Sequence, residues 1–127
     1  MFRQSKYRNK KVVIDGETFD SKKEYKYYKQ LCEREKNGEI SELCRQVTFD
    51  IIPSLYENVE KQLKTKIKIV RRFIQYGITY TADFTYKENG NLVVCDCKAS
   101  AEFQDPVYRI KKKLMRYLLN IDIVELY

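Results

Sequence analysis

The sequence predicts a single α/β domain in which a mixed central sheet, containing an antiparallel hairpin, is flanked by helices. Three observations predict this fold: Asn89-Gly90 separates two strand-like segments, capped helical segments begin near Ser21 and Asp105, and one more strand-like segment follows the second helix. The 127 residues match the length of one domain, and a hydrophobic share of 43% can fill one core. We therefore expect one domain over residues 12–127, preceded by a flexible basic arm at residues 1–11.

The first elements are a strand and a helix. Residues 12–14 form a short apolar strand, and Asp15-Gly16 marks a turn after it. Ser21 can N-cap a helix, with Glu24 at the spacing of a capping box, and Gly38 ends that helix.

Strands fill the middle of the chain. Residues 46–52 predict a strand that Pro53 ends, whereas residues 54–64 fit no element clearly. Residues 65–74 alternate in part and predict another strand. The clearest strands are residues 79–86 and 92–98, because Asn89-Gly90 between them favours a two-residue hairpin turn.

A helix and a strand complete the expected fold. Asp105 can cap a helix with Pro106 at its first position, and the helical pattern extends to about Asn120. Residues 121–126 then predict a closing strand.

Charge and residue types narrow the function. The net charge of +7 and the pI of about 9.2 favour a polyanionic partner. No apolar run could span a membrane and residues 1–11 lack a signal-peptide core, so we expect a cytoplasmic protein without a membrane partner. The sequence has no His, which excludes His-based triads and His metal ligands. The four cysteines lack the spacing of a zinc site, so we expect reduced thiols.

The hairpin places two carboxylates opposite each other. Counting outward from the Asn89-Gly90 turn, paired residue numbers sum to 179, so Asp83 is expected opposite Asp96. Lys98 shares the face of Asp96 because strand side chains alternate. The other face holds Ala82, Phe84 and Cys95 among its apolar residues and is expected to cover the core.

Directly opposed carboxylates repel each other, and a divalent cation would compensate for this repulsion. An ordinary surface cluster in which Lys98 neutralises Asp96 is the alternative. Glu24 begins the core-facing stripe of its helix, where a carboxylate needs a partner. Capping and a role in the site explain Glu24 equally well.

These motifs resemble the PD-(D/E)xK nuclease superfamily across residues 12–127. The resemblance rests on S-x-x-E at residues 21–24, Y-T-A-D-F at 80–84 and V-V-C-D-C-K at 93–98. A family of small phage nuclease-like proteins is most similar, through F-D-S-x-x-E, G-x-I-x-x-L-x-x-Q, A-D-F and D-x-K. The sequence is also similar to phage junction-resolving endonucleases. Ala82 replaces the usual Pro, and Asp96 replaces the commoner Glu.

The resemblance implies a restriction-endonuclease-like core and a site that binds Mg²⁺ or Mn²⁺. Glu24, Asp83, Asp96 and Lys98 would be catalytic, and the carbonyl of Cys97 would join the three carboxylates as a metal ligand. Gln46 would lie near the site, although a strand-end side chain bonded to backbone is the alternative.

Two segments are candidates for contact with DNA. The final helix has an apolar stripe of Val107, Ile110, Leu114 and Leu118, and a basic stripe of Arg109, Lys112, Lys113 and Arg116. Tyr108 and Lys111 lie between these stripes and could approach the active site. The arm contributes Arg3, Lys6, Arg8, Lys10 and Lys11. A solvated helix face and a solvated tail fit these residues equally well, and Arg71 and Arg72 are weaker candidates.

The sequence therefore favours a metal-dependent deoxyribonuclease that hydrolyses phosphodiester bonds. The sequence shows no motif that would recognise DNA bases, so we expect selectivity for the shape or structure of the DNA. The resemblance suggests branched or junction DNA in phage replication or recombination, and symmetric cutting would favour a homodimer. The alternative is a non-catalytic nucleic-acid-binding or recombination-accessory protein that retains the nuclease fold.

Overall fold

The computed structural model of the protein describes residues 11–14, 16–100, 102 and 104–127. The elements of this part of the chain are, in order, β1 (Val12–Ile14), β2 (Glu17–Phe19), α1 (Lys22–Lys36), β3 (Ser41–Ile52), β4 (Leu55–Gln62), β5 (Ile67–Gln75), β6 (Ile78–Glu88), β7 (Asn91–Cys97), α2 (Pro106–Leu119) and β8 (Ile123–Leu126). Neither helix in these residues is long and apolar enough to cross a membrane.

The fold is α/β with a mixed sheet, as predicted. Its four-stranded sheet has the order β3-β6-β7-β8, in which β6 and β7 are antiparallel and β7 and β8 are parallel. Two antiparallel pairs, β1-β2 and β4-β5, form separate two-stranded sheets. The sequence pattern missed β2, and it left the segment that forms β4 unassigned.

The described chain divides into two compact units. The first comprises the chain up to residue 47 together with residues 82–104 and 123–127, and the second comprises residues 48–81 and 105–122. A single domain over residues 12–127 stays a prediction. Of the predicted basic arm, Arg3, Lys6, Arg8 and Lys10 lie outside the described residues, whereas Lys11 is described and exposed.

Helix α1 has the predicted ends. The Ser21 hydroxyl accepts the Glu24 backbone N–H at 3.1 Å, which satisfies one of the donors that a helix N-terminus leaves unpaired. At the other end Asn37 is the C-cap, and Gly38 adopts φ 79°, a left-handed conformation that favours glycine.

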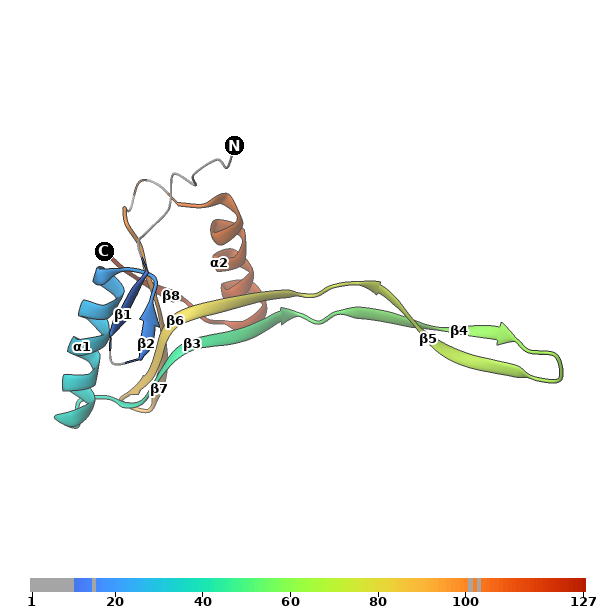
Figure 1. Ribbon diagram of the computed structural model, residues 1–127, viewed down its shortest axis with the longest axis horizontal. Helices are drawn as coiled ribbons and strands as arrows, with labels where there is room; N and C mark the ends of the chain where they lie inside the picture. Colours follow the sequence, from blue (N-terminus) through green and yellow to red (C-terminus); the bar gives the residue numbers. More distant parts are fainter. Residues whose placement is uncertain (1–10, 15, 101, 103) are drawn as a thin grey trace. The chain divides into compact units, whose positions relative to one another are not determined.

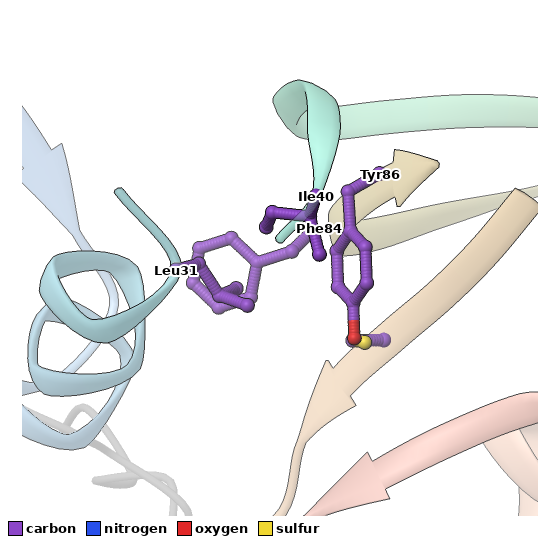
Figure 2. Close-up of a cluster of buried hydrophobic side chains, with 5 residues drawn as sticks. Leu31, Ile40, Phe84 and Tyr86 are labelled. Carbon is purple, nitrogen blue, oxygen red and sulfur yellow. The ribbon is translucent and has the colours of Figure 1, made fainter. Parts of the chain in front are cut away.

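The first unit has its hydrophobic core between α1 and the β6–β7 hairpin. Leu31 of α1 packs with Ile40 and with Phe84, Tyr86 and Cys95 of the hairpin. In Figure 2 the side chains of Leu31 and Phe84 point toward one another. This arrangement confirms that the apolar face of the hairpin covers the core.

The hairpin register is the predicted one. Pairs run from Glu88 opposite Asn91 to Phe84 opposite Cys95, and every pair of residue numbers sums to 179. The regular pairing stops there, one residue before Asp83 and Asp96.

Two backbone segments of the second unit pack closely at Gly77. Pro53 and Ser54 interrupt the chain between β3 and β4, and Gly77 lies between β5 and β6. The Gly77 N–H donates to the Ser54 hydroxyl at 3.0 Å, and a Cβ at Gly77 would lie 2.1 Å from the Ile52 carbonyl oxygen. Only glycine fits this position.

Helix α2 buries a different face from the one its aliphatic pattern predicts. Tyr108 and Met115 are buried, and the Tyr108 ring lies 6.3 Å from that of Tyr80. The expected stripe is largely in solvent, because Val107 and Ile110 are 57% and 58% exposed. The prediction was wrong because apolar residues occur around most of this helix, so their spacing does not define one phase. The predicted caps, Asp105 and Asn120, are confirmed.

Gly77→Ala should destabilise the protein by about 3 kcal/mol or more, because the methyl group would overlap backbone atoms that cannot move aside. Gly38→Ala is the matched control: its Cβ would meet open space, so only the left-handed backbone should cost about 1 kcal/mol. Urea denaturation measures both variants. Equal losses of unfolding free energy would contradict the steric role of Gly77.

Candidate active site

Three carboxylates from two segments of the first unit meet beside the start of α1. Asp20 immediately precedes the N-cap, Glu24 lies in the first helical turn, and Asp83 lies on β6. One carboxylate oxygen from each of them lies within 4.8 Å of the others. The sequence predicted Glu24 and Asp83 for this cluster but assigned no role to Asp20.

Glu24 takes part in both the helix cap and the carboxylate cluster. Its side chain is buried, accepts the Asp20 N–H at 3.1 Å and accepts the Gln46 amide at 3.1 Å. Burial raises the pKa of Glu24, although the Asp20 N–H and the nearby Arg45 oppose this shift. The two explanations that the sequence left open are therefore compatible.

Asp83 joins the carboxylate cluster to the next strand. Where the regular β6–β7 pairing stops, the Asp83 carboxylate accepts the Cys97 N–H at 2.8 Å. Burial raises the pKa of Asp83 to about 8, and the hydrogen-bonded, negatively charged Asp96 beside it acts in the same direction. Asp83 and Asp96 are thus neighbours, as predicted, and Asp83 favours retaining its proton.

Lys98 lies beside Asp96. Its ammonium nitrogen is 3.1 Å from an Asp96 carboxylate oxygen, and both side chains are largely buried. The Lys98 backbone is held on two sides, since its N–H donates to the Leu126 carbonyl at 2.7 Å and its carbonyl accepts the Lys23 ammonium at 2.7 Å. The D-x-K motif therefore occupies a fixed position next to Asp83.

Gln46 bridges the two sides of the cluster. Its amide nitrogen lies 3.1 Å from Glu24 and 3.4 Å from Asp83. Its backbone has φ 52°, which is uncommon for a residue other than glycine and often marks a strand bulge that redirects a side chain. The structure places Gln46 in the cluster, in agreement with the resemblance and against the strand-end alternative.

Arg45 is a second residue that the sequence did not single out. Its guanidinium lies 3.6 Å from both Glu17 and Glu24 and stacks 3.8 Å from the centre of the Phe19 ring. It therefore offsets part of the negative charge of Glu24. Its position depends on packing between β2, α1 and β3, for which the local sequence gives no signal. The signal for Asp20 was available, because an acid directly before a helix N-cap lies next to the first-turn Glu.

The donor atoms fit a hard divalent cation. Glu24, Asp83, Asp96 and Asp20 offer oxygen ligands, which Mg²⁺ and Mn²⁺ prefer, and burial raises the pKa of both Glu24 and Asp83. Burial raises the pKa of the Cys97 thiol to about 12, so this sulfur is a neutral thiol and a poor ligand for a soft metal. The Cys97 carbonyl as a ligand stays a prediction.

The remaining predicted residues belong to α2 in the second unit. Tyr108 is buried and Lys111 is half-buried, and their approach to the site stays a prediction. Arg109 and Lys113 are exposed, Lys112 is half-buried, and Arg116 pairs with Asp122 at 3.3 Å.

The comparison with protein families gives one result. A model of the family described as "Protein of unknown function (DUF1064)" matches residues 4–123, most of the chain. The chain belongs to this family. No curated protein and no solved structure matches this member of DUF1064. The carboxylate cluster, Gln46 and Lys98 all lie within the matched residues.

Asp83→Asn should stabilise the metal-free protein, and more strongly at pH 8 than at pH 4.5. Between the ordinary carboxyl pKa of 3.8 and the folded value of about 8, the folded state binds more protons than the unfolded state, so wild-type stability falls as pH rises. Asparagine removes this dependence and can still accept the Cys97 N–H. At pH 8 we expect a gain of about 1 kcal/mol or more, which is a few degrees in melting temperature.

The measurement is thermal unfolding in a chelator at both pH values. Asp50→Asn, at an exposed position of β3, is the control and should leave the stability profile unchanged. If the melting temperatures of Asp83→Asn and the wild type change with pH in the same way, the ionisation of Asp83 does not destabilise the folded protein.

Proposed function

We propose that this DUF1064 protein is a metal-dependent endonuclease that hydrolyses phosphodiester bonds in DNA and has a restriction-endonuclease-like core of the PD-(D/E)xK type. The observation that supports the proposal most is a chain of contacts beside the start of α1: Glu24 and Asp83 lie in one carboxylate cluster, Asp96 is hydrogen-bonded to Asp83, and Lys98 pairs with Asp96. These residues come from separate motifs, and the order of those motifs is the one that resembles the nuclease superfamily.

The carboxylates of Glu24, Asp83 and Asp96 would hold Mg²⁺ or Mn²⁺, with Asp20 and the Cys97 carbonyl as further oxygen donors. When bound, the ion would activate water and stabilise the departing oxygen. Gln46 holds the side chains of Glu24 and Asp83 in place.

Lys98 would supply a positive charge to the reaction. Its ammonium lies 3.1 Å from an Asp96 carboxylate oxygen, a position from which it would orient an attacking water. In the transition state the same charge would offset the negative charge that develops on the phosphate. The Lys23–Lys98 and Lys98–Leu126 hydrogen bonds fix the backbone from which this side chain extends.

The alternative is a non-catalytic nucleic-acid-binding or recombination-accessory protein. The raised pKa values of Asp83 and Glu24 favour the enzyme, because a purely binding protein gains nothing from buried acids that repel phosphate. Structure-selective cutting of branched or junction DNA in phage replication or recombination belongs to the same proposal and rests on the resemblance. A homodimer would suit symmetric cutting of two strands, and a cytoplasmic location stays a prediction from the sequence.

Asp83→Asn should reduce metal-dependent cleavage by on the order of 10³-fold or more while DNA binding survives, because the variant loses a ligand charge but repels phosphate less. Cleavage of linear, flapped and four-way-junction DNA with Mg²⁺ or Mn²⁺ is the measurement. Asp50→Asn, purified in parallel, is the matched control and should cut normally. Undiminished cutting by Asp83→Asn would refute its role as a ligand, and a wild-type protein that binds DNA without cutting it would favour the accessory function.

Replacing Arg109 and Lys113 of α2 together by Ala should weaken DNA binding without reducing cleavage at saturating DNA. Both side chains are exposed, so the fold should tolerate the change. Each phosphate contact that is lost should lower the log–log salt slope of binding by about 0.9 on duplex DNA. Binding is measured by fluorescence anisotropy with Ca²⁺ in place of Mg²⁺. An unchanged slope would show that this helix face is only solvated.

A further inference from the structure

Strands β4 and β5 form a two-stranded ribbon with no buried side chain. Their register is unbroken from Tyr56 opposite Phe73 to Gln62 opposite Ile67, and Figure 1 shows the two strands running side by side. Every residue of the ribbon is exposed or half-buried. Two-stranded hairpins are marginally stable in water by themselves, so a ribbon of this length is expected to gain stability from a partner.

The ribbon is strongly basic toward its turn. Between Glu60 and Asp83 the sequence has no acidic residue, and it has the cations Lys61, Lys64, Lys66, Lys68, Arg71 and Arg72. Lys61 lies directly opposite Lys68, an arrangement of like charges that destabilises a bare sheet. Lys64 and Lys66 lie in the connection beyond them, where the Leu63 N–H donates to the Lys66 carbonyl at 2.8 Å. This group of four lysines, the tip lysines, complements a polyanion.

The arginines nearer the base are already engaged. Arg72 pairs with Glu57 across the strands, and the Arg71 guanidinium lies 3.7 Å from the centre of the Tyr56 ring. These contacts stiffen the base of the ribbon. Glu57 balances the charge of Arg72, and most of the remaining positive charge of the ribbon lies at the tip.

We propose that the tip of the β4–β5 ribbon enters a groove of duplex DNA and contacts phosphates through Lys61, Lys64, Lys66 and Lys68. The major groove, about 12 Å wide, admits a two-stranded ribbon. Lys61 and Lys68 lie on different strands, so their ammonium groups can reach phosphates on opposite sides of the groove. The inference rests on the proposed action on DNA and adds a binding element that is separate from the carboxylate cluster.

A second copy of the chain is the competing occupant, because Ile67 and Ile69 are 57% and 67% exposed. The area that one face of the ribbon could bury is too small for a stable interface with a second copy. Eight residues of strand extend about 26 Å, so one face of the ribbon, roughly 10 Å wide, offers about 260 Å². A stable protein interface buries about 800 Å² on each partner. The apposed lysines would also repel a second copy of the tip.

The test replaces the four tip lysines together by Gln in the full chain. Lys26, Lys29, Lys36 and Lys87, all exposed in the first unit, are replaced by Gln in a control variant that loses the same net charge. Anisotropy with duplex DNA is measured in Ca²⁺ between about 50 and 200 mM salt. The tip variant should bind at least about tenfold more weakly, with a salt slope smaller by up to about 3.6, or 0.9 for each contact. The control should change the slope by less than about one contact.

Two further measurements distinguish a loss of DNA contacts from misfolding and from a loss of dimerisation. Circular dichroism checks that both variants fold, and sedimentation of Ile67→Thr/Ile69→Thr reports whether the ribbon joins two copies. Equal DNA binding by the wild type and the tip variant would overturn the proposal, as would a dimer that dissociates in the isoleucine variant while the tip variant binds DNA normally. Cleavage with Mg²⁺ at saturating DNA should persist in the tip variant. If the wild-type protein binds DNA through the tip lysines but does not cut it, the proposed nuclease activity is wrong and the proposed role of the tip stands.

Discussion

The burial of several carboxylates in one small volume is the constraint on which the rest of the first unit depends. Burial raises the pKa of Glu24 and Asp83, and the neighbouring carboxylates repel one another, so the fold holds these two acids there against their electrostatic preference. It does so with strong local structure. The Ser21 cap fixes the start of α1, and the packing of Leu31 against Phe84 holds the helix on the hairpin. A proton on Asp83 would relieve part of the repulsion, and a divalent cation would relieve more.

Several residues around the carboxylate cluster each stabilise a different part of it. Gln46 donates to acids on both sides, Arg45 offsets the charge of Glu24, and the Cys97 N–H takes the Asp83 carboxylate where strand pairing ends. The interruption of the pairing is thus part of the site, because a regular ladder would give this N–H a backbone partner. Functional sites commonly keep such strained or repulsive features when the surrounding fold can support them.

The second unit contributes exposed charge. In α2 the buried face is defined by Tyr108 and Met115, which leaves Arg109 and Lys113 in solvent. In the β4–β5 ribbon, positive charge collects at the tip while the base is stiffened by Arg71 and Arg72. In the proposed function, catalysis and attraction to DNA would depend on different elements of the chain, so a substitution could weaken one without the other.

Local sequence determined the elements whose signals are short-ranged: the caps of both helices, the Asn89-Gly90 turn and, through that turn, the register that makes Asp83 and Asp96 neighbours. Tertiary structure alone decided which face of α2 is buried, because its apolar residues allow more than one phase. It also decided that β4, whose sequence fits no element clearly, pairs with β5, and that Arg45 and Gln46 meet Glu24. Arg45 and Gln46 are far from Glu24 in the chain, and only the packing of α1 against the strands brings them together.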